Sequence, residues 1–521
     1  MRVLACLSFG LLCYGVAGCS NSATTTDMPA AMADMATPPS QGDMSPPVLP
    51  GTMAAPGTWQ LLGLLDDGTV IALDTSKTPN AGISAMPAGG GAMVPIDPKG
   101  TVAVIRHNTV FAFQTFDQTT GAGIFTVWNA ESGDHVVPGS GLSYAAGVSD
   151  DGKHVVYLST TDKSTAEIWL STSDFVTQKL LGTFDLTDNT CPPDVRVAGN
   201  IGIFAGCAII TSTPDGGAGD MTVPGPIDGG LSMANQGASL YTVDVNTGVV
   251  SLRRYPTSPF FAIDPTGTSI IALDGQDILP FVMHAAGGGG AVPLDTASIN
   301  PASAMIFTPD GKNVLYATND GKLKISPLAA PAPVVLDSSG AASPVQLSPD
   351  GRWVLFDKGQ NQTTQTTDLY ITSTTAGGTA VTLSKAQTAS IFGDAFTADN
   401  SHILYITNTD TTLGIGVYDS LNVAGGGTPT VLAKRQWIGW ATTGTNVIYN
   451  DDYASPGGKS PNISQGTANI YTADATSASS AKPVATEAMP DFFLTKDKTK
   501  FIYSYAKKGA PMAGIYIAPI Q

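Results

Sequence analysis

A short unit that recurs through most of the chain constrains its fold more than any other feature. The clearest copy is LSPDGRWVLFD, Leu347 to Asp357. Its Ser-Pro-Asp-Gly segment predicts a tight turn, because proline sets φ, the serine oxygen can bond back to the chain, and glycine accepts a left-handed conformation. The apolar run 353–356 that follows predicts a strand buried on both faces, since a strand of an exposed sheet would alternate.

Related turns recur along the chain, each followed by an apolar run; they lie at 96–100, 148–152, 263–267, 307–311, 347–351, 396–400 and 494–497, with weaker copies near 199 and 444. Each unit also contains a later strand with an aromatic residue, such as Leu369-Tyr370, and then a short apolar strand. Four strands per unit follow, which we name a, b, c and d, with the tight turn between a and b. A period of roughly 40 to 50 residues of this kind predicts a β-propeller. We therefore predict an all-β fold for residues 58–521, a single propeller of about eight or nine four-stranded blades.

The turn, the apolar strand after it and the later Leu/Ile-Tyr strand resemble the TolB-type, WD40-like propeller repeat, which also occurs in the propellers of prolyl oligopeptidases. The resemblance covers most of residues 96–521 and implies the fold, whereas propellers serve many functions. TolB carries an α/β domain before its propeller, and no helical period precedes the repeats here.

Both ends of the repeat region contain partial units. From Trp59 to about residue 90 we expect three strands (WQLLGLL, TVIALD and ISAMP), and the last unit has DFFL, FIYSY and GIYIAPI without a fourth strand. An unpaired edge strand invites aggregation. We therefore expect the N-terminal strands to close the propeller by pairing with the last unit.

The N-terminus predicts a lipoprotein. Residues 1–18 have a basic start and an apolar stretch too short to span a membrane, and Val16-Ala17-Gly18-Cys19 resembles the bacterial lipobox, in which Cys19 is lipidated. The alternative is an ordinary secretory signal with an incidental cysteine. Residues 19–57 are rich in small and polar residues and predict a disordered tether. We expect a bacterial cell-envelope protein that touches the outer membrane only through its lipid and faces either the periplasm or the surface.

The acidic composition restricts the partners. The chain has 42 Asp and Glu against 25 Lys and Arg, a net charge of −17, which disfavours nucleic acid. We expect a monomer whose partner is an envelope protein or a glycan.

Cys191 and Cys207 are candidates for a disulfide. If Gly199-Asn200 turns the a–b hairpin, Cys207 falls opposite residue 192, one step from Cys191, and exported proteins form disulfides. The alternative is a pair of buried free thiols.

A search for catalytic and metal-binding patterns gives little. No G-x-S-x-G motif is present, no hydrolase domain is expected, and the histidines (107, 135, 154, 284 and 402) lack zinc-ligand spacing. His154 and His402 hold equivalent places after their turns, which favours a structural role. We therefore predict no catalytic residue, no metal and no cofactor. Trp437 and Trp440, which we place on one a strand, either reach a central channel or pack between blades.

The long polar insertions share one position in the unit. They span 159–166, 211–237, 358–367, 408–414, 451–468 and 506–513, all between strands b and c. Because strands alternate in direction, every b–c loop emerges at the same end of its sheet, and elaborated loops usually carry function. We expect a non-catalytic binding or scaffold protein that uses this end. The alternative is an enzyme, a lyase or hydrolase, that acts at the mouth of the central channel.

Overall fold

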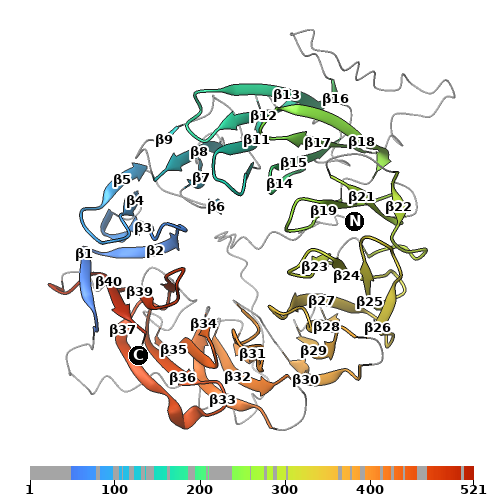
Figure 1. The fold of residues 1–521 in the computed structure, drawn as a ribbon. Coiled ribbons are helices and arrows are strands. Elements are labelled where there is room, and N and C mark those ends of the chain that lie inside the picture. The colour runs from blue at the N-terminus through green and yellow to red at the C-terminus, as the bar shows by residue number, and fades with distance from the viewer. Residues whose placement is uncertain are drawn as a thin grey trace, which may run out of the picture. The chain divides into compact units, whose positions relative to one another are not determined.

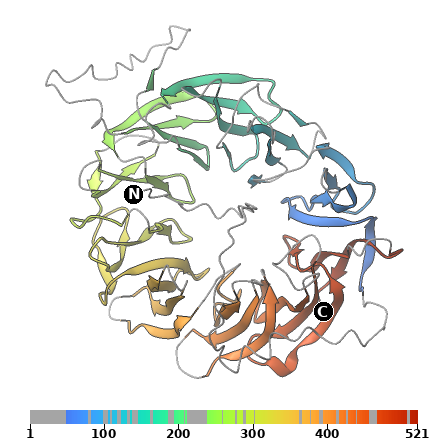
Figure 2. The same cartoon turned by 180° about the vertical axis from the view of Figure 1, so that it is seen from behind.

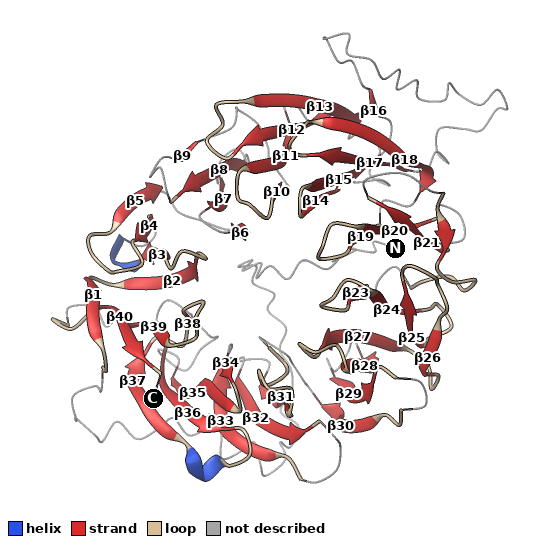
Figure 3. Cartoon of the chain, in the orientation of Figure 1, coloured by secondary structure: helices blue, strands red, loops and turns tan. Residues whose placement is uncertain are grey.

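A computed structural model of the chain consists almost entirely of β-strands (Figure 1 and Figure 3). It describes residues 49–77, 82–97, 105–107, 110–116, 123–130, 135–136, 146–160, 165–185, 194–206, 209–210, 238–257, 260–274, 278–285, 290–300, 303–361, 366–375, 378–387, 394–410, 415–423, 428–437, 440–454, 466–505 and 510–520. Within these ranges the only helical segments are the short η1 (Thr75–Lys77) and η4 (Ala478–Ser480). The predicted all-β fold class is confirmed.

The described strands form ten antiparallel sheets, which we number 1 to 10 by chain order. They belong to two compact units. The central unit comprises Thr101–Pro344 and the short segment Leu65–Asp67. The terminal unit comprises Gly68–Gly100, Val345–Gln521 and, of the described N-terminal residues, those from 49 to 64.

The central unit contains sheets 2 to 6. Sheet 2 holds β6 (Ile105–His107), β7 (Val110–Phe116), β8 (Gly123–Asn129) and β9 (His135–Val136). Sheet 3 holds β10 (Ala146–Val148), β11 (His154–Thr160), β12 (Thr165–Thr172), β13 (Gln178–Asp185) and, at its edge, β16 (Ile209–Ile210). Sheet 4 holds β14 (Asp194–Ala198), β15 (Ile201–Gly206), β17 (Ala238–Asp244) and β18 (Val249–Thr257). Sheet 5 holds β19 (Phe261–Ile263), β20 (Ser269–Leu273), β21 (Pro280–His284) and β22 (Val292–Pro293); sheet 6 holds β23 (Ile306–Phe307), β24 (Asn313–Ala317), β25 (Leu323–Pro327) and β26 (Val334–Asp337).

The terminal unit contains sheets 1 and 7 to 10. Sheet 1 holds β2 (Trp59–Leu64), β3 (Val70–Asp74), β4 (Ile83–Met86) and β5 (Val94–Asp97). Sheet 7 holds β27 (Ala342–Leu347), in which the boundary between the units falls, β28 (Trp353–Asn361), β29 (Thr366–Ser373) and β30 (Val381–Gln387). Sheet 8 holds β31 (His402–Asp410), β32 (Ile415–Asn422) and β33 (Thr430–Trp437); sheet 9 holds β34 (Trp440–Thr443), β35 (Asn446–Ala454), β36 (Thr467–Asp474) and β37 (Lys482–Ala488). Sheet 10 holds β38 (Phe492–Leu494), β39 (Lys500–Tyr505), β40 (Gly514–Pro519) and β1 (Thr52–Pro56).

Within each unit, consecutive sheets pack face to face, as the views from both sides show (Figure 1 and Figure 2). Phe204 of sheet 4 packs with Val156 of sheet 3, and Tyr418 of sheet 8 packs with Tyr449 of sheet 9. The second strands are buried on both faces, as the apolar runs predict: Val354, Leu355 and Phe356, whose side chains alternate between the two faces of β28, are all completely buried. Four-stranded sequential sheets stacked through both faces are the building unit of a β-propeller.

The tight turn forms as the sequence predicts. In the copy at 348–351, the Ser348 hydroxyl donates to Oδ1 of Asp350 at 2.6 Å and accepts the Trp353 amide at 3.0 Å. Gly351 has φ +70°, and its amide donates to the Ser348 carbonyl at 2.8 Å. Thr308 and Thr397 make the same hydroxyl-to-Asp contact in their turns. The repeat is therefore a local hydrogen-bond pattern that a few side chains specify.

The number and limits of the N-terminal repeats differ from the prediction. Residues 59–97 form a complete sheet 1, whose a–b turn contains Asp66, Asp67 and Gly68 (φ +88°). Ile96 and Asp97, the described part of the turn predicted at 96–100, instead end β5, the fourth strand of sheet 1, and the a–b pairing of sheet 2 joins β6 to β7 through His107 and Val110. The described residues consequently contain ten sheets rather than eight or nine.

An N-terminal strand pairs with the last sheet, as predicted, but it is not one of the strands from Trp59 onward. Strand β1 pairs antiparallel with β40 from Thr52↔Ile517 to Pro56↔Gly514. This strand lies inside residues 19–57, which the sequence analysis assigns to the tether. The boundary of the folded part therefore moves to before residue 52. TMAAP has one β-branched residue, no aromatic residue and a proline, so its strand structure depends on pairing with β40.

Candidate binding surface at the b–c ends of the sheets

The polar insertions lie between strands b and c of their repeats, as predicted; in sheet 8 the a strand is reduced to the single bridge Phe396↔Ile403. They join β11 to β12, β15 to β17, β28 to β29, β31 to β32, β35 to β36 and β39 to β40. Much of their length is outside the described residues. The longest begins with β16, which pairs with β13 at the edge of sheet 3 through Ile210↔Thr183. We name this end of every sheet, with the b–c and d–a connections, the b–c end.

The opposite end is made of regular, mutually contacting turns. In the terminal unit the Asp350 amide donates to Oδ1 of Asn400 in the next a–b turn at 3.2 Å. In the central unit the Asp150 amide donates to the Gly199 carbonyl at 3.2 Å. These contacts bind neighbouring turns together, so variation between repeats is concentrated at the b–c end.

Sheets 7, 8 and 9 share a bulge at their b–c ends. In each, the b strand contains one more residue than the paired stretch of the c strand, just before the connecting loop. The extra residue lies between Lys358 and Asn361 in sheet 7, between Thr407 and Asp410 in sheet 8, and between Asp451 and Ala454 in sheet 9. The first residue of each bulge is left-handed: Gly359 has φ +63°, Asn408 +51° and Asp452 +57°. Bulges of this kind bend and twist a hairpin and redirect its side chains.

A carboxylate with a raised pKa accompanies each of these bulges. Burial raises the pKa of Asp357 in β28 to about 6, and burial likewise raises that of Asp419 in β32 to about 6. Asp419 also accepts a hydrogen bond from the Thr407 hydroxyl at 2.7 Å. Burial raises the pKa of Asp451, which precedes the bulge of sheet 9, although backbone amides donate to it.

The bulge of sheet 9 is braced from both sides. Oδ1 of Asp451 accepts the Arg435 amide of β33 at 2.8 Å, which joins sheet 9 to sheet 8. Oδ2 of Asp452 accepts the Asn469 amide group at 3.1 Å and the Tyr471 hydroxyl at 3.2 Å. A left-handed aspartate costs about 1–3 kcal/mol and persists only where its surroundings fix it. The bulge is thus held in a definite shape.

Asp419 gives a pH-dependent prediction. A folded pKa of about 6 lies above the ordinary value of 3.8, so the contribution of this carboxyl to stability is present at low pH and is lost as the pH rises through 6. Asp419→Asn should therefore raise the free energy of unfolding by about 2 kcal/mol at pH 7.5, and the gain should vanish near pH 4. Urea denaturation at both pH values measures it.

Asp497→Asn is the matched control of opposite sign. Hydrogen bonds from Thr495 and then from Thr499 lower the pKa of Asp497 to about 2, so its contribution is present above pH 3.8 and is lost toward pH 2. The control should be less stable than the parent protein at pH 7.5. If Asp419→Asn raised the free energy of unfolding equally at pH 7.5 and pH 4, the raised pKa of Asp419 would be contradicted.

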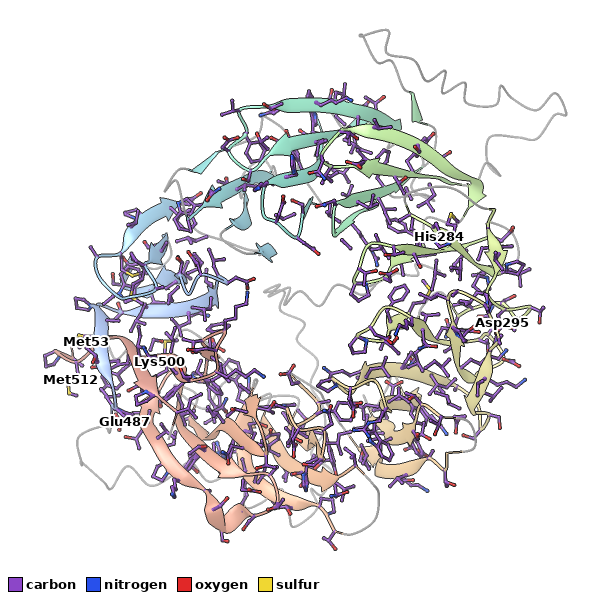
Figure 4. The ribbon with its side chains drawn as sticks, in the orientation of Figure 1. Met53, His284, Asp295, Glu487, Lys500 and Met512 are labelled. Carbon is purple, nitrogen blue, oxygen red and sulfur yellow. The ribbon has the colours of Figure 1, made fainter. Side chains whose placement is uncertain are left out.

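Two grooves lie at b–c ends, one in each unit. The first, of about 370 Å³, is in the central unit; it is lined by Asn300, Thr318, Asn319, Asp320, Gly321, Ala341, Ala342 and Ser343. The second, of about 420 Å³, is in the terminal unit between sheets 10 and 1; it is lined by Pro56, Gly57, Thr58, Trp59, Asp74, Ser76, Ala510, Pro511 and Ala513. Met512 follows Pro511 in the same β39–β40 link and is labelled, with Met53 of β1, in Figure 4.

The structure separates the predicted tryptophan pair. Trp437 ends β33 and stacks on Tyr453 with ring centroids 4.7 Å apart, whereas Trp440 begins β34 and packs on Tyr418 at 4.9 Å. The two residues are therefore on different strands, which corrects the single a strand of the sequence analysis. Both indoles are buried between sheets 8 and 9, so the structure shows the second of the two alternatives, packing between sheets.

His154 and His402 begin β11 and β31, the equivalent places that the repeat indicates. Nδ1 of His402 is 2.8 Å from the Ser401 hydroxyl, and burial lowers the pKa of this histidine. The described residues contain no group of three or more His, Cys, Asp or Glu side chains that could hold a metal ion. Within them, no helix is long and apolar enough to cross a membrane.

The cysteine predictions fall outside the described residues, as Cys19, Cys191 and Cys207 all do. The hairpin that motivates the disulfide does form: Ala198 pairs with Ile201 and Asp194 with Ala205, so the chain turns at Gly199-Asn200. The lipidation and the disulfide stay predictions.

Sequence reasoning missed the bulges and the Trp59 groove. The only signal for the bulges is a Gly, Asn or Asp shortly after the buried part of each b strand, since these residues tolerate a left-handed conformation. The Trp59 groove has no local signal, because its walls come from residues more than four hundred positions apart in the chain.

No protein-family model matches the chain, and no curated protein matches it. Among solved structures, it is similar to a eukaryotic initiation factor with a TM-score of 0.46 and 13% identity, covering 74% of this chain and 89% of that one. TolB from Acinetobacter baumannii has a TM-score of 0.29 and 14% identity over 61% of this chain and 80% of that one. The β-propeller domain of the Trilobed protease from Pyrococcus furiosus has a TM-score of 0.33 and 11% identity over 74% and 96%. At such scores the propeller-type assignment rests on the sheets themselves.

Proposed function

We propose that this chain is a non-catalytic binding protein of the bacterial cell envelope, which recognises a protein or glycan partner through the b–c ends of its sheets. The observation that carries the proposal is the bulged hairpin repeated in sheets 7, 8 and 9. Three consecutive sheets place the same distorted hairpin at the same end, with a carboxylate of raised pKa beside each bulge.

The conformational cost of the bulges supports a role in recognition. A plain hairpin could connect β35 to β36, as the tight turn between β34 and β35 connects those strands. The bulge instead requires a left-handed Asp452, which is unfavourable unless neighbouring groups hold it. Strained and bulged positions are concentrated at functional sites. Rigid, polar hairpins whose loops differ in sequence suit the selection of one partner.

The N-terminus supplies the location in this proposal. Cys19 carries the lipid, and the residues between it and β1 connect the lipid to the folded part. A tether of this composition keeps a binding domain near the membrane and raises its effective concentration toward a partner there. The protein works as a monomer, with neither metal nor cofactor.

Shortening the loops of these hairpins tests the proposal. Residues 362–365, 411–414 and 455–466 are each replaced by Asn-Gly, which connects two strands as a tight hairpin and leaves the bulges in place. Capture of the partner from crosslinked membranes by the full chain should fall at least about tenfold, which corresponds to 1.4 kcal/mol. The melting temperature of the shortened variant should equal that of the parent protein, because all the described strands are retained.

The matched control shortens a connection at the opposite end of the same unit, residues 424–427 between β32 and β33. This variant should capture the partner as well as the parent protein does. Equal capture by all three proteins, or an equal loss in both variants, would reject the b–c end as the binding surface.

A further inference from the structure

We propose that the groove between sheets 10 and 1 of the terminal unit binds one neutral sugar ring of a glycan, stacked on the indole of Trp59. The inference rests on the proposed function and names a ligand class for one part of the b–c end. The groove measures about 420 Å³, within the range of small-molecule sites, and all its lining residues belong to this unit.

The groove is preformed. Its floor is the link from β1 to β2, and the Gly57 amide donates to the Ala513 carbonyl at 2.9 Å on one side. On the other side, the Thr75 amide donates to the Thr58 carbonyl at 2.9 Å. The indole is oriented by its own N–H, which donates to the Pro56 carbonyl at 3.0 Å. A rigid site loses little conformational entropy on binding.

Gly57 makes this close arrangement possible. Its φ is +124°, and a Cβ at this position would lie 2.7 Å from Nε1 of Trp59. Any other residue would therefore displace the indole or the link. The backbone at Gly57 lies against the Nε1 edge of the Trp59 indole. The Trp59 side chain itself stays partly exposed and lines the groove.

The polar groups of the groove suit hydroxyl groups. The Asp74 carboxylate is fixed by the Ser76 amide at 3.0 Å and the Ser76 hydroxyl at 2.6 Å, and carboxylates accept hydrogen bonds from sugar hydroxyls. Thr58 also lines the groove, and its hydroxyl is buried without a hydrogen-bond partner in the structure. Such a group is costly unless a ligand or water satisfies it.

The charge of the groove selects against other ligand classes. Its lining contains no Lys, Arg or His, so phosphate and acidic sugars meet only the Asp74 carboxylate. A single carboxylate is too few ligands for a divalent cation. A neutral sugar ring offers an apolar C–H face for the indole and hydroxyls for Asp74 and Thr58, and it matches every group named here.

Titration of the full chain with neutral hexasaccharides tests the inference. The probes are cellohexaose, maltohexaose, mannohexaose and N-acetylchitohexaose, with the corresponding monosaccharides to separate a free sugar from a ring within a polymer. At least one hexasaccharide should bind. Trp59→Ala should weaken that binding about tenfold or more, whereas Trp59→Phe should weaken it less. Thr58→Val, which keeps the side-chain volume, and Asp74→Asn should each weaken it several-fold, and they decide the question if Trp59→Ala does not fold.

Asn319→Ala, in the groove of the central unit, is the matched control and should not change the affinity. Tetragalacturonate, an acidic sugar, and a proline-rich decapeptide should not compete with the bound hexasaccharide. Absence of binding by all four hexasaccharides, unchanged affinity in the Trp59 and Thr58 variants, or displacement by the peptide overturns the inference. If partner capture still depends on the hairpin loops in the Trp59→Ala protein, the proposed function stands even when this inference fails.

Discussion

Deleting residues 49–56 should lower the free energy of unfolding of the terminal unit by at least about 4 kcal/mol, because sheet 10 then loses its fourth strand. Strand β1 pairs with β40 from Thr52↔Ile517 to Pro56↔Gly514, and each backbone hydrogen bond contributes about 0.5–1.5 kcal/mol. Ala55 is completely buried in the same cluster as Ile515. The Tyr503 hydroxyl also donates to the Pro50 carbonyl at 2.8 Å.

Urea denaturation followed by near-ultraviolet circular dichroism measures this loss. The deletion also exposes β40 as an edge strand, so we expect faster aggregation on heating. Deleting residues 40–47, an equally long segment before the described chain, is the control and should leave the denaturation midpoint unchanged. An unchanged midpoint after deletion of 49–56 would contradict the closing role of β1.

Lys324→Met should destabilise the central unit by about 3–5 kcal/mol, because it leaves a buried carboxylate without its cation. Asp295, labelled in Figure 4, accepts the Lys324 ammonium at 2.8 Å, the Tyr316 hydroxyl at 2.7 Å and the Ala297 amide at 3.1 Å. Burial opposes ionisation of this carboxyl, but the hydrogen bonds from Lys324 and Tyr316 outweigh it and hold its pKa below the ordinary value.

The pH dependence and two further variants separate this cause from a general packing defect. A lowered pKa means that the stability due to Asp295 is present above pH 3.8 and is lost as the pH falls. The difference in the free energy of unfolding between Lys324→Met and the parent protein should therefore shrink toward pH 3. Lys322→Met breaks the exposed pair with Asp320 and should cost much less stability, because exposed ion pairs contribute little. Adding Asp295→Asn to Lys324→Met should recover part of the loss. Equal losses in the two lysine variants would contradict the account.

Local hydrogen bonding explains why most of the fold is predictable from sequence. The hydroxyl of Ser348 and the carboxylate of Asp350 close their turn within four residues, so the pattern is visible in the chain itself. The corresponding turn of sheet 1 has Asp66 and Asp67 before Gly68, without the Ser/Thr-Pro pair, so the repeat pattern does not predict it. Strand β1 was assigned to the tether because its partner β40 lies at the other end of the chain.

The candidate surface is less predictable, because its features depend on pairing between distant residues. The position of the insertions follows from the strand order and was correct. The bulge at Asp452 requires the register of β35 against β36, which no residue type fixes alone. The raised pKa of Asp419 results from the packing of neighbouring sheets around β32, and Trp59 gains its groove only when residues 510–513 lie beside it.

Site-specific photo-crosslinking in cells tests the central claim, recognition through the b–c end, most directly. A photoreactive amino acid is placed at Gly359 or Asp452, in the bulges of sheets 7 and 9, and in separate cells at Thr375 or Ser477, in the c–d connections of the same two sheets. We expect the bulge positions to yield one shared crosslinked partner, protein or glycan, and the c–d positions to yield none of it. Crosslinks to that partner from Thr375 and Ser477, with none from Gly359 and Asp452, would contradict the claim.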